Sequence, residues 1–210
     1  MVWRRLMGLV VAVVVAAASL AAAAQGTGDD AAPGKFSRFL KGQFLVATSR
    51  IGDPRFARTV IYMISHDVEG AMGLIINRAY GRGPLAGFLE GFGIDPGDAE
   101  GEVVLRYGGP VEPGRGFVLH GGDFESPGAT PIGNGLVLNT DRDILEAIAR
   151  GEGPRRALFI LGYSGWGPSQ LEGEMARDDW VSAPADADLV FDQDLDSLWE
   201  RVLPRAGIKM

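Results

Sequence analysis

Two neighbouring apolar runs constrain the fold of this chain more than any other feature of its sequence. The runs TVIYMISHD (59–67) and AMGLIINR (71–78) are rich in β-branched and aromatic residues, and a short glycine-containing turn separates them. Their apolar residues are continuous and do not alternate with polar ones. Strands with this pattern are buried on both faces. We therefore expect a pair of strands inside the molecule, covered by helices or by a closed sheet.

Apolar patterns and glycine or proline breaks predict the remaining elements. Further strands are expected at 42–50, 102–109, 116–122, 135–140 and within 155–167, where the strand enters a glycine-rich turn, with a short edge strand at 180–185. Helices are expected within 83–93, 140–153, 168–179 and 194–207. Thr140 is the expected N-cap of the second helix and Pro168 lies in the first turn of the third. Strands and helices are mixed without a regular βαβ order, which predicts a single α/β or α+β domain with a mixed, curved sheet.

The first 24 residues have the pattern of a secretory signal peptide. Arg4 and Arg5 supply a positive start, an apolar run follows, and Ala22 and Ala24 have the spacing of a cleavage site. We therefore expect cleavage after Ala24 and a periplasmic or secreted protein.

The alternative for this segment is an uncleaved anchor in the inner membrane, because residues 6–24 are nearly long enough to span a bilayer. Residues 25–35 are small, polar and acidic, which is typical of a flexible tether. No second linker, repeat or low-complexity run follows. The sequence thus predicts residues 1–24 as signal peptide or anchor, 25–35 as tether and 36–210 as one folded domain.

Composition excludes several kinds of site. The chain has no cysteine, so disulfides, Cys-ligated zinc, iron–sulfur clusters and cysteine nucleophiles are excluded. With only two histidines, we expect no histidine-rich metal site and assign no metal and no cofactor; the alternative is a carboxylate site for a hard cation. Without residues 1–24 the chain carries 18 basic and 27 acidic residues, a net charge of −9. This balance opposes direct binding to nucleic acid, whose phosphate backbone attracts basic surfaces.

The run GYSGWG (162–167) comes close to a nucleophile elbow. That motif needs G-x-S-x-G between a strand and a helix, and Ser164 has this context. The second glycine of the motif is missing, because position 166 is Trp166. We interpret the run as a tight turn in which Tyr163 and Trp166 pack.

The run GGPVEPGRGFVLHGGDF (108–124) allows two interpretations. It lacks the residues of a Walker loop or a dinucleotide loop. Gly108 and Gly109 could offer backbone N–H groups to an anion, with Arg115 as the counter-charge. Alternatively, the prolines and glycines shape a rigid connection between two strands. We predict a shaped connection that also forms part of a recognition surface.

The two histidines are weak catalytic candidates. His66 and His120 each end a predicted strand, with Asp67 and Asp123 nearby. A histidine beside an acid suits acid–base catalysis, and Asp53 is a further candidate acid. The alternative is that each histidine satisfies a neighbouring backbone group.

Three blocks of the chain together resemble the AlgH/YqgE family. They are DPRFARTVIYMISHDVEGAMGLIINR (53–78), YGGPVEPGRGFVLH (107–120) and ALFILGYSGWGPSQLEGEMARDDW (157–180), in the family's order and spacing. The resemblance implies a mixed sheet folded into a partial barrel with flanking helices. It adds Gln170 to the candidate binding residues. The family is associated by name with regulation of alginate production, and its usual members lack the N-terminal export segment.

The leading functional prediction is a non-enzymatic binding module with an indirect regulatory role. Its glycine-lined surface would combine the blocks 108–120 and 162–172, so that Arg115, Tyr163 and Trp166 contact a small anionic ligand or an extended segment of a partner protein. The first alternative is a hydrolase-type enzyme that uses His120 or His66. The second, implied only by the family resemblance, is a transcriptional regulator.

Overall fold

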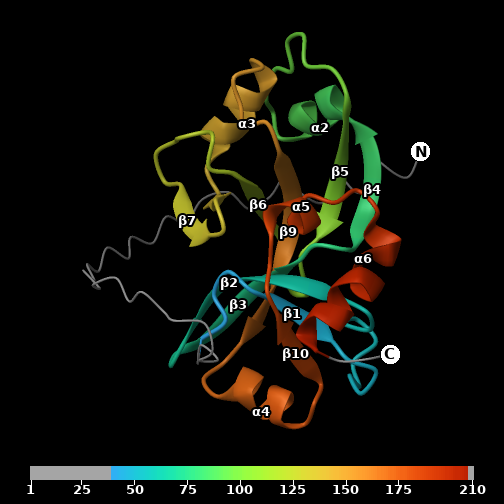
Figure 1. Cartoon of the computed structure of the whole chain (residues 1–210). Helices are drawn as coiled ribbons and strands as arrows, with labels where there is room; N and C mark the ends of the chain where they lie inside the picture. The colour runs from blue at the N-terminus through green and yellow to red at the C-terminus, as the bar shows by residue number, and fades with distance from the viewer. Residues whose placement is uncertain (1–38, 208–210) are drawn as a thin grey trace.

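Strand β9 (Ala157–Trp166) runs through both halves of the sheet and organises the molecule (Figure 1). The structure is a computed structural model that describes residues 39–207. The first half of β9 pairs in parallel with β5 (Glu102–Tyr107) and antiparallel with β6 (Val111–Gly121). Its second half pairs with β3 (Gly70–Ile75). Two groups of strands therefore share one central strand.

Eight of the ten strands follow the order β10-β1-β2-β3-β9-β6-β8-β7; off this path, β5 pairs with β9 and β4 pairs with β5. The other strands are β1 (Phe44–Ala47), β2 (Val60–Asp67), β4 (Ala79–Pro84), β7 (Thr130–Gly133), β8 (Leu136–Asn139) and β10 (Trp180–Ala183). The helices are α2 (Leu85–Gly91), α3 (Arg142–Ala149), α4 (Gln170–Ala176), α5 (Ala187–Val190) and α6 (Leu195–Val202), followed by the 3₁₀ turn η1 (Leu203–Ala206). The sheet is mixed and curls into a half-barrel, which confirms the predicted fold class.

Helices cover both faces of the sheet. In Figure 1, α4 lies at one end of the molecule, α2 and α3 lie at the other, and α5 and α6 lie between them. The largest apolar core packs α5, α6 and η1 against one face of the curled sheet. A second core packs α4 against β1–β3, and a third packs α2 and α3 against β5, β6 and β9.

The predicted strand pair at 59–67 and 71–78 is buried on both faces. Tyr62 and Leu74 belong to the core under α5 and α6. Ile61 and Ile75 belong to the core under α4. All four side chains have no exposed surface, so a continuous apolar sequence is what this position requires.

Three glycines allow the end of β5 to cross β9. A Cβ at Gly108 would lie 2.2 Å from the carbonyl oxygen of Gly162, and one at Gly109 would lie 2.3 Å from the carbonyl group of Tyr163. Gly162 and Gly109 also have positive φ, of 71° and 149°, which residues with a Cβ rarely adopt. The glycine pair at 108–109 is therefore required by close backbone packing.

Two predicted loops are parts of strands. β9 continues through GYSGW to Trp166, so the predicted tight turn is wrong: Gly162 makes an irregularity within the strand. β6 begins at Val111, because the segment predicted as a loop runs beside β9 as a wide bulge. Residues 112–115 of this bulge lie opposite Gly162 alone. A bulge of this kind bends a strand and redirects its side chains.

Several helix boundaries also differ from prediction. The N-cap of α3 is Asp141, one residue after Thr140, and Pro168 precedes α4 instead of lying in its first turn. The last helix, in contrast, lies within its predicted range and ends before Pro204, at Val202, where a 3₁₀ turn follows. The short elements β4, β7 and α5 were not predicted. They are rich in glycine, proline or acidic residues and give weak patterns.

The predicted signal peptide or anchor at 1–24 and the tether at 25–35 lie outside the described residues. Both stay predictions. Within 39–207, none of the helices combines the length and apolarity needed to cross a bilayer.

Candidate functional site

The recognition surface predicted from the sequence is divided between the two faces of β9. The blocks 108–120 and 162–172 do meet, since Val111 of β6 pairs with Tyr163 of β9 and the Ser164 hydroxyl donates to the Gly108 carbonyl. Tyr163, however, packs against Phe117 beside the largest core, with ring centroids 6.1 Å apart. Trp166 packs against Trp180 in the core under α4, at 5.9 Å. Because side chains alternate along a strand, residues three apart point to opposite faces.

Arg115 and Tyr163 form a small exposed group on the bulge of β6. The Arg115 guanidinium lies 3.2 Å from the Glu112 carboxylate and 5.2 Å from the centre of the Phe117 ring. The Tyr163 hydroxyl donates to Glu112 over 3.4 Å. Burial raises the pKa of Tyr163 above its usual value, and the Glu112 charge raises this pKa further. This group lies at the surface, and none of its residues lines the cleft described below.

Trp166 and Gln170 lie on the other face and hold a carboxylate. One oxygen of Glu174 accepts hydrogen bonds from two indole N–H groups, that of Trp166 at 2.9 Å and that of Trp180 at 2.8 Å. The other oxygen accepts from the Gln170 amide at 2.9 Å. Gln170 is fixed in turn, because its own oxygen accepts from the Gly167 N–H at 3.1 Å. The Glu174 carboxylate is therefore held in one orientation.

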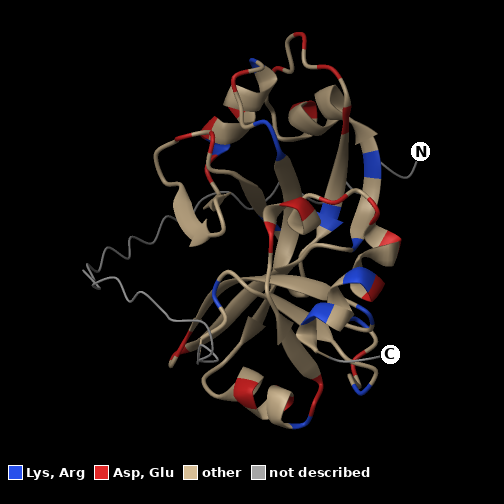
Figure 2. Ribbon diagram, viewed as in Figure 1, with Lys and Arg blue, Asp and Glu red and all other residues tan. Residues whose placement is uncertain are grey.

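This carboxylate lines a cleft of about 400 Å³, which we call the Glu174 cleft. Its walls come from the loop after β1 and from the segment between α4 and β10. The lining residues are Arg50, Ile51, Gly52, Asp53, Phe56, Glu174, Arg177, Asp179 and Trp180. The volume lies in the range of small-molecule and side-chain pockets. Along α4 and the segment after it, acidic residues lie on both sides of one basic residue, Arg177 (Figure 2).

Asp53 helps to shape one wall of the Glu174 cleft. Its carboxylate makes a bidentate pair with Arg55, with nitrogen–oxygen distances from 2.6 to 3.1 Å, and accepts the backbone N–H of Arg55 at 2.9 Å. These hydrogen bonds lower the pKa of Asp53 below its usual value. Next to it, the Phe56 ring packs edge-on against Trp180 at 5.5 Å. The predicted candidate acid thus lines the same cleft as Trp180, whereas His120 does not line it.

The loop that carries Asp53 and Phe56 is fixed by the corner after β3. The Asn77 side chain accepts the Val60 N–H at 2.8 Å and donates to the Arg58 carbonyl at 2.9 Å. Arg78 donates to the Ala57 carbonyl at 2.6 Å. An exposed loop that is held so firmly presents its side chains in a defined arrangement, which suits binding.

His66 is engaged at both ring nitrogens. Its Nδ1 accepts the Leu40 N–H at 3.2 Å, and its Nε2 lies 3.2 Å from a carboxylate oxygen of Glu172. The side chain is 2% exposed. These contacts join the start of the described chain to β2 and α4, and they account for His66 as a structural residue.

His120 is completely buried. Its Nδ1 pairs with the carbonyl of Gly121 at 2.8 Å, and its ring packs against Phe124. Its Nε2 has no hydrogen-bond partner among the described residues. The structure places His66 and His120 in different clusters, and neither contacts the Glu174 cleft.

Hydrogen bonds join Gly108, just after β5, to Ser164 and Leu161 of β9. The buried Ser164 hydroxyl donates to the Gly108 carbonyl at 3.2 Å. The Gly108 N–H donates to the Leu161 carbonyl at 2.8 Å. The serine is therefore enclosed in the sheet, and the amide predicted to be open to an anion is used inside the fold. An anion-binding role for Gly108 stays a prediction without geometric support.

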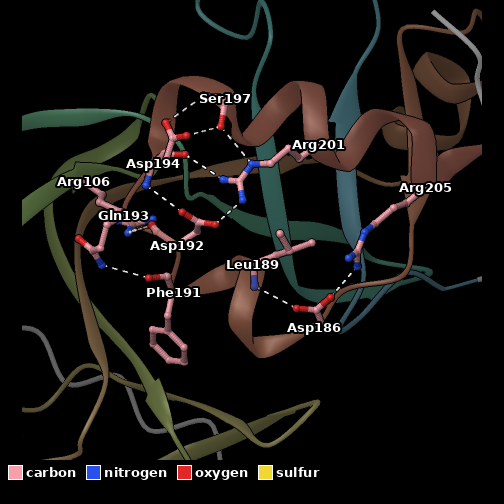
Figure 3. A network of polar contacts seen from close by, with 10 residues as sticks. All are labelled: Arg106, Asp186, Leu189, Phe191, Asp192, Gln193, Asp194, Ser197, Arg201 and Arg205. Carbon is pink, nitrogen blue, oxygen red and sulfur yellow. Dashed lines mark hydrogen bonds and ion pairs between the residues drawn. The ribbon is translucent and has the colours of Figure 1, made fainter.

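Sequence reasoning missed a buried arginine. Arg106 has no exposed surface, and its guanidinium donates to the carbonyls of Ile76 and, at 2.9 Å, Asp192 (Figure 3). Burial lowers the pKa of Arg106 to about 10. The Asp192 carboxylate is held by Arg201 at 2.5 Å. Arg106 thus ties the segment before α6 to the sheet, and only its position inside an apolar strand hinted at this.

Glu174 and Trp180 were also missed as site residues. The available signal was the spacing of Gln170 and Glu174, since residues four apart share a helix face. Glu172 and Glu174 lie two apart on α4 and have different partners, because one pairs with His66 and the other with the two tryptophans.

Fold and site define a mixed-sheet half-barrel domain with a polar cleft and without an assembled catalytic set among the described residues. The chain belongs to the AlgH-like family (DUF179), whose profile matches residues 44–210. This agrees with the resemblance carried by the three sequence blocks.

Relatives and solved structures support this membership. A UPF0301 protein of Methylococcus capsulatus is 49% identical over 80% of this chain and 92% of its own length. A UPF0301 protein of Afipia carboxidovorans is 45% identical over 89% of this chain and 94% of its own. The solution structure of the AlgH protein from Pseudomonas aeruginosa has a TM-score of 0.71 and 36% identity, covering 87% of this chain and 94% of that one. None of these names states a reaction.

Proposed function

We propose that the domain is a non-enzymatic module that binds an extended segment of a partner protein at the Glu174 cleft. The observation that carries the proposal is the cleft itself: about 400 Å³, with a carboxylate fixed by two indole N–H groups and an amide. Fixing a polar group before a ligand arrives lowers the entropic cost of binding.

The position of the cleft favours an extended segment as its ligand. Asp179 and Trp180 line the cleft, and β10 begins at Trp180. β10 is at one end of the sheet order, so it has a strand partner, β1, on one side only. A peptide added along such an edge gains main-chain hydrogen bonds, and a pocket beside the edge supplies specificity.

The placement of the histidines supports binding over catalysis. General acid–base catalysis needs a nitrogen within reach of the substrate proton. His66 has both nitrogens engaged and a 2% exposed side chain, and His120 has no exposed surface. An indirect regulatory role, through the bound partner, is consistent with this proposal and with the acidic charge of the chain.

The test is a selection of peptides with two blocked variants. Random twelve-residue peptides are displayed and selected on the wild-type protein, and binding is then compared on Gly52→Trp and Gly114→Trp. Gly52 lines the cleft and Gly114 lies in the bulge beside Arg115; both are exposed, and an added Cβ at either meets nothing within 4 Å. Each variant therefore fills one surface without disturbing the core.

We expect Gly52→Trp to abolish binding of the selected peptides and Gly114→Trp to leave it unchanged. The reverse result would move the site to the Arg115–Tyr163 group. Failure to enrich any peptide on the wild-type protein, with thermal unfolding showing that it is folded, would overturn the proposal.

A further inference from the structure

The Glu174 carboxylate is a charge without a cation. The ion pairs formed within residues 39–207 include thirteen acid–base contacts, and Glu174 takes part in none of them. Its three hydrogen bonds come from neutral donors, two indoles and one amide. Neutral donors orient a carboxylate and leave its negative charge uncompensated.

The two arginines that line the same cleft are already paired elsewhere. Arg177 lies 2.9 Å from Asp179, and Arg50 lies 2.8 Å from Asp178. Asp53 on the opposite wall is paired with Arg55. The cleft therefore contains one acidic group that is both fixed and unpaired.

One oxygen of Glu174 keeps capacity for a ligand. Oε2 accepts two indole N–H groups, whereas Oε1 accepts the Gln170 amide alone. A carboxylate oxygen has room for about two acceptor contacts. Oε1 can thus accept one further hydrogen bond, and a donor that carries positive charge makes the stronger bond.

Aromatic rings form the adjacent walls. Phe56 and Trp180 both line the cleft, and they contact each other edge-on. Aromatic rings attract the guanidinium group and the methylene stem of basic side chains. The described residues contain no group of three or more His, Cys, Asp or Glu side chains placed to hold a metal ion, so this donor set suits an organic cation better than a metal.

We propose that the Glu174 cleft selects a basic side chain, arginine or lysine, of the extended partner segment. This inference rests on the proposed function and names the chemistry of the partner. The guanidinium or ammonium donates to Oε1 of Glu174, and its stem lies against Phe56. The net charge of −7 for the whole chain favours the approach of a basic segment.

The experiment uses the peptide of highest affinity from the selection described above. Its basic residue is replaced by citrulline, which keeps the shape of arginine and removes the charge, and binding is measured by titration calorimetry. Both peptides are titrated into the wild-type protein, into Glu174→Gln and into the control Glu90→Gln. Glu90 is exposed on α2, far from the cleft lining, and loses the same charge.

We expect the citrulline peptide to bind the wild-type protein at least tenfold more weakly than the arginine peptide. We expect the same loss of affinity when the arginine peptide binds Glu174→Gln. The two changes together should cost no more than either alone, because both remove the same contact. Glu90→Gln should leave both affinities unchanged. Thermal unfolding checks that each variant is folded. The citrulline peptide tests the same contact on the wild-type protein, so that result does not depend on the folding of a variant.

The results separate this inference from the proposed function. Two results would contradict the choice of a basic side chain: selected peptides that have no basic residue at a fixed position, or peptides whose affinity does not change with citrulline. Either result would still agree with the proposed function, binding of a partner segment at the cleft. Free agmatine, a small guanidinium compound, tests whether the bound cation must belong to a peptide. If agmatine binds as tightly as the peptide, the ligand is a small free cation and the proposal of a partner segment is wrong.

Discussion

The two faces of β9 carry similar side chains and differ in what surrounds them. On one face, Tyr163 and Arg115 share the Glu112 carboxylate at the surface. On the other, Trp166 is 7% exposed and shares the Glu174 carboxylate with Trp180. Both groups contain an aromatic residue that donates to a glutamate, and the second lines the Glu174 cleft.

This difference shows that residue type alone does not define a recognition surface. Arg115, Tyr163 and Trp166 look like one binding set in the sequence, but strand alternation sends the two aromatic side chains to opposite faces. The exposed ion pair at Arg115 gains little energy in water. The Glu174 group is half-buried, where hydrogen bonds to a charge are stronger.

The largest effect is expected at the backbone crossing on which both faces depend. Gly109→Ala would place a Cβ 2.3 Å from the Tyr163 carbonyl, at a φ of 149°. We expect a loss of about 4 kcal/mol or more in the free energy of unfolding, because backbone atoms cannot give way. Urea unfolding measures the loss. The control Gly114→Ala lies in the same segment without a contact, and a similar loss there would contradict the crossing argument.

A smaller loss is expected when the buried carboxylate is removed. Glu174→Ala leaves the indole N–H groups of Trp166 and Trp180 without their acceptor. An unsatisfied buried donor costs about 1–3 kcal/mol, so we expect a loss of about 2–3 kcal/mol in unfolding free energy. Arg115→Ala on the other face should cost less than about 0.5 kcal/mol. Equal losses for the two variants would remove the distinction between the faces.

The fold was largely predictable because its strongest signals are apolar. The burial of β2 and β3 on both faces follows from their continuous apolar runs. Both strands begin within two residues of their predicted starts. The elements that were missed, β4, β7 and α5, have sequences such as AYGRGP and TPIG, in which no periodic apolar pattern exists. Their structure comes from pairing with neighbours, which a local pattern does not contain.

The site was less predictable than the fold because it depends on contacts between distant segments. Asp53, Trp166 and Gln170 were candidates, and the structure brings all three to the cleft or its supporting hydrogen bonds. The carboxylate that joins them, Glu174, was not among the candidates. The bulge at 112–115 and the irregularity at Gly162 set which face each side chain takes, and neither can be read from periodicity.

The smallest expected effect tests the electrostatics of the exposed face. The Glu112 charge raises the pKa of Tyr163, and Arg115 acts in the opposite direction. Glu112→Gln should therefore lower the pKa of Tyr163, because the tyrosinate no longer meets a nearby negative charge, whereas Arg115→Ala should raise it. Absorbance at the tyrosinate wavelength, followed with pH, measures both shifts against a Tyr163→Phe baseline.

Opposite shifts would show that Tyr163, Glu112 and Arg115 form one electrostatic group at the surface. Shifts in the same direction, or none, would mean that the three side chains do not stay together in solution. The bulge would then be mobile, whereas the Glu174 group is fixed. A mobile bulge would sharpen the contrast, since a site that orders its side chains before binding loses less entropy when a partner arrives.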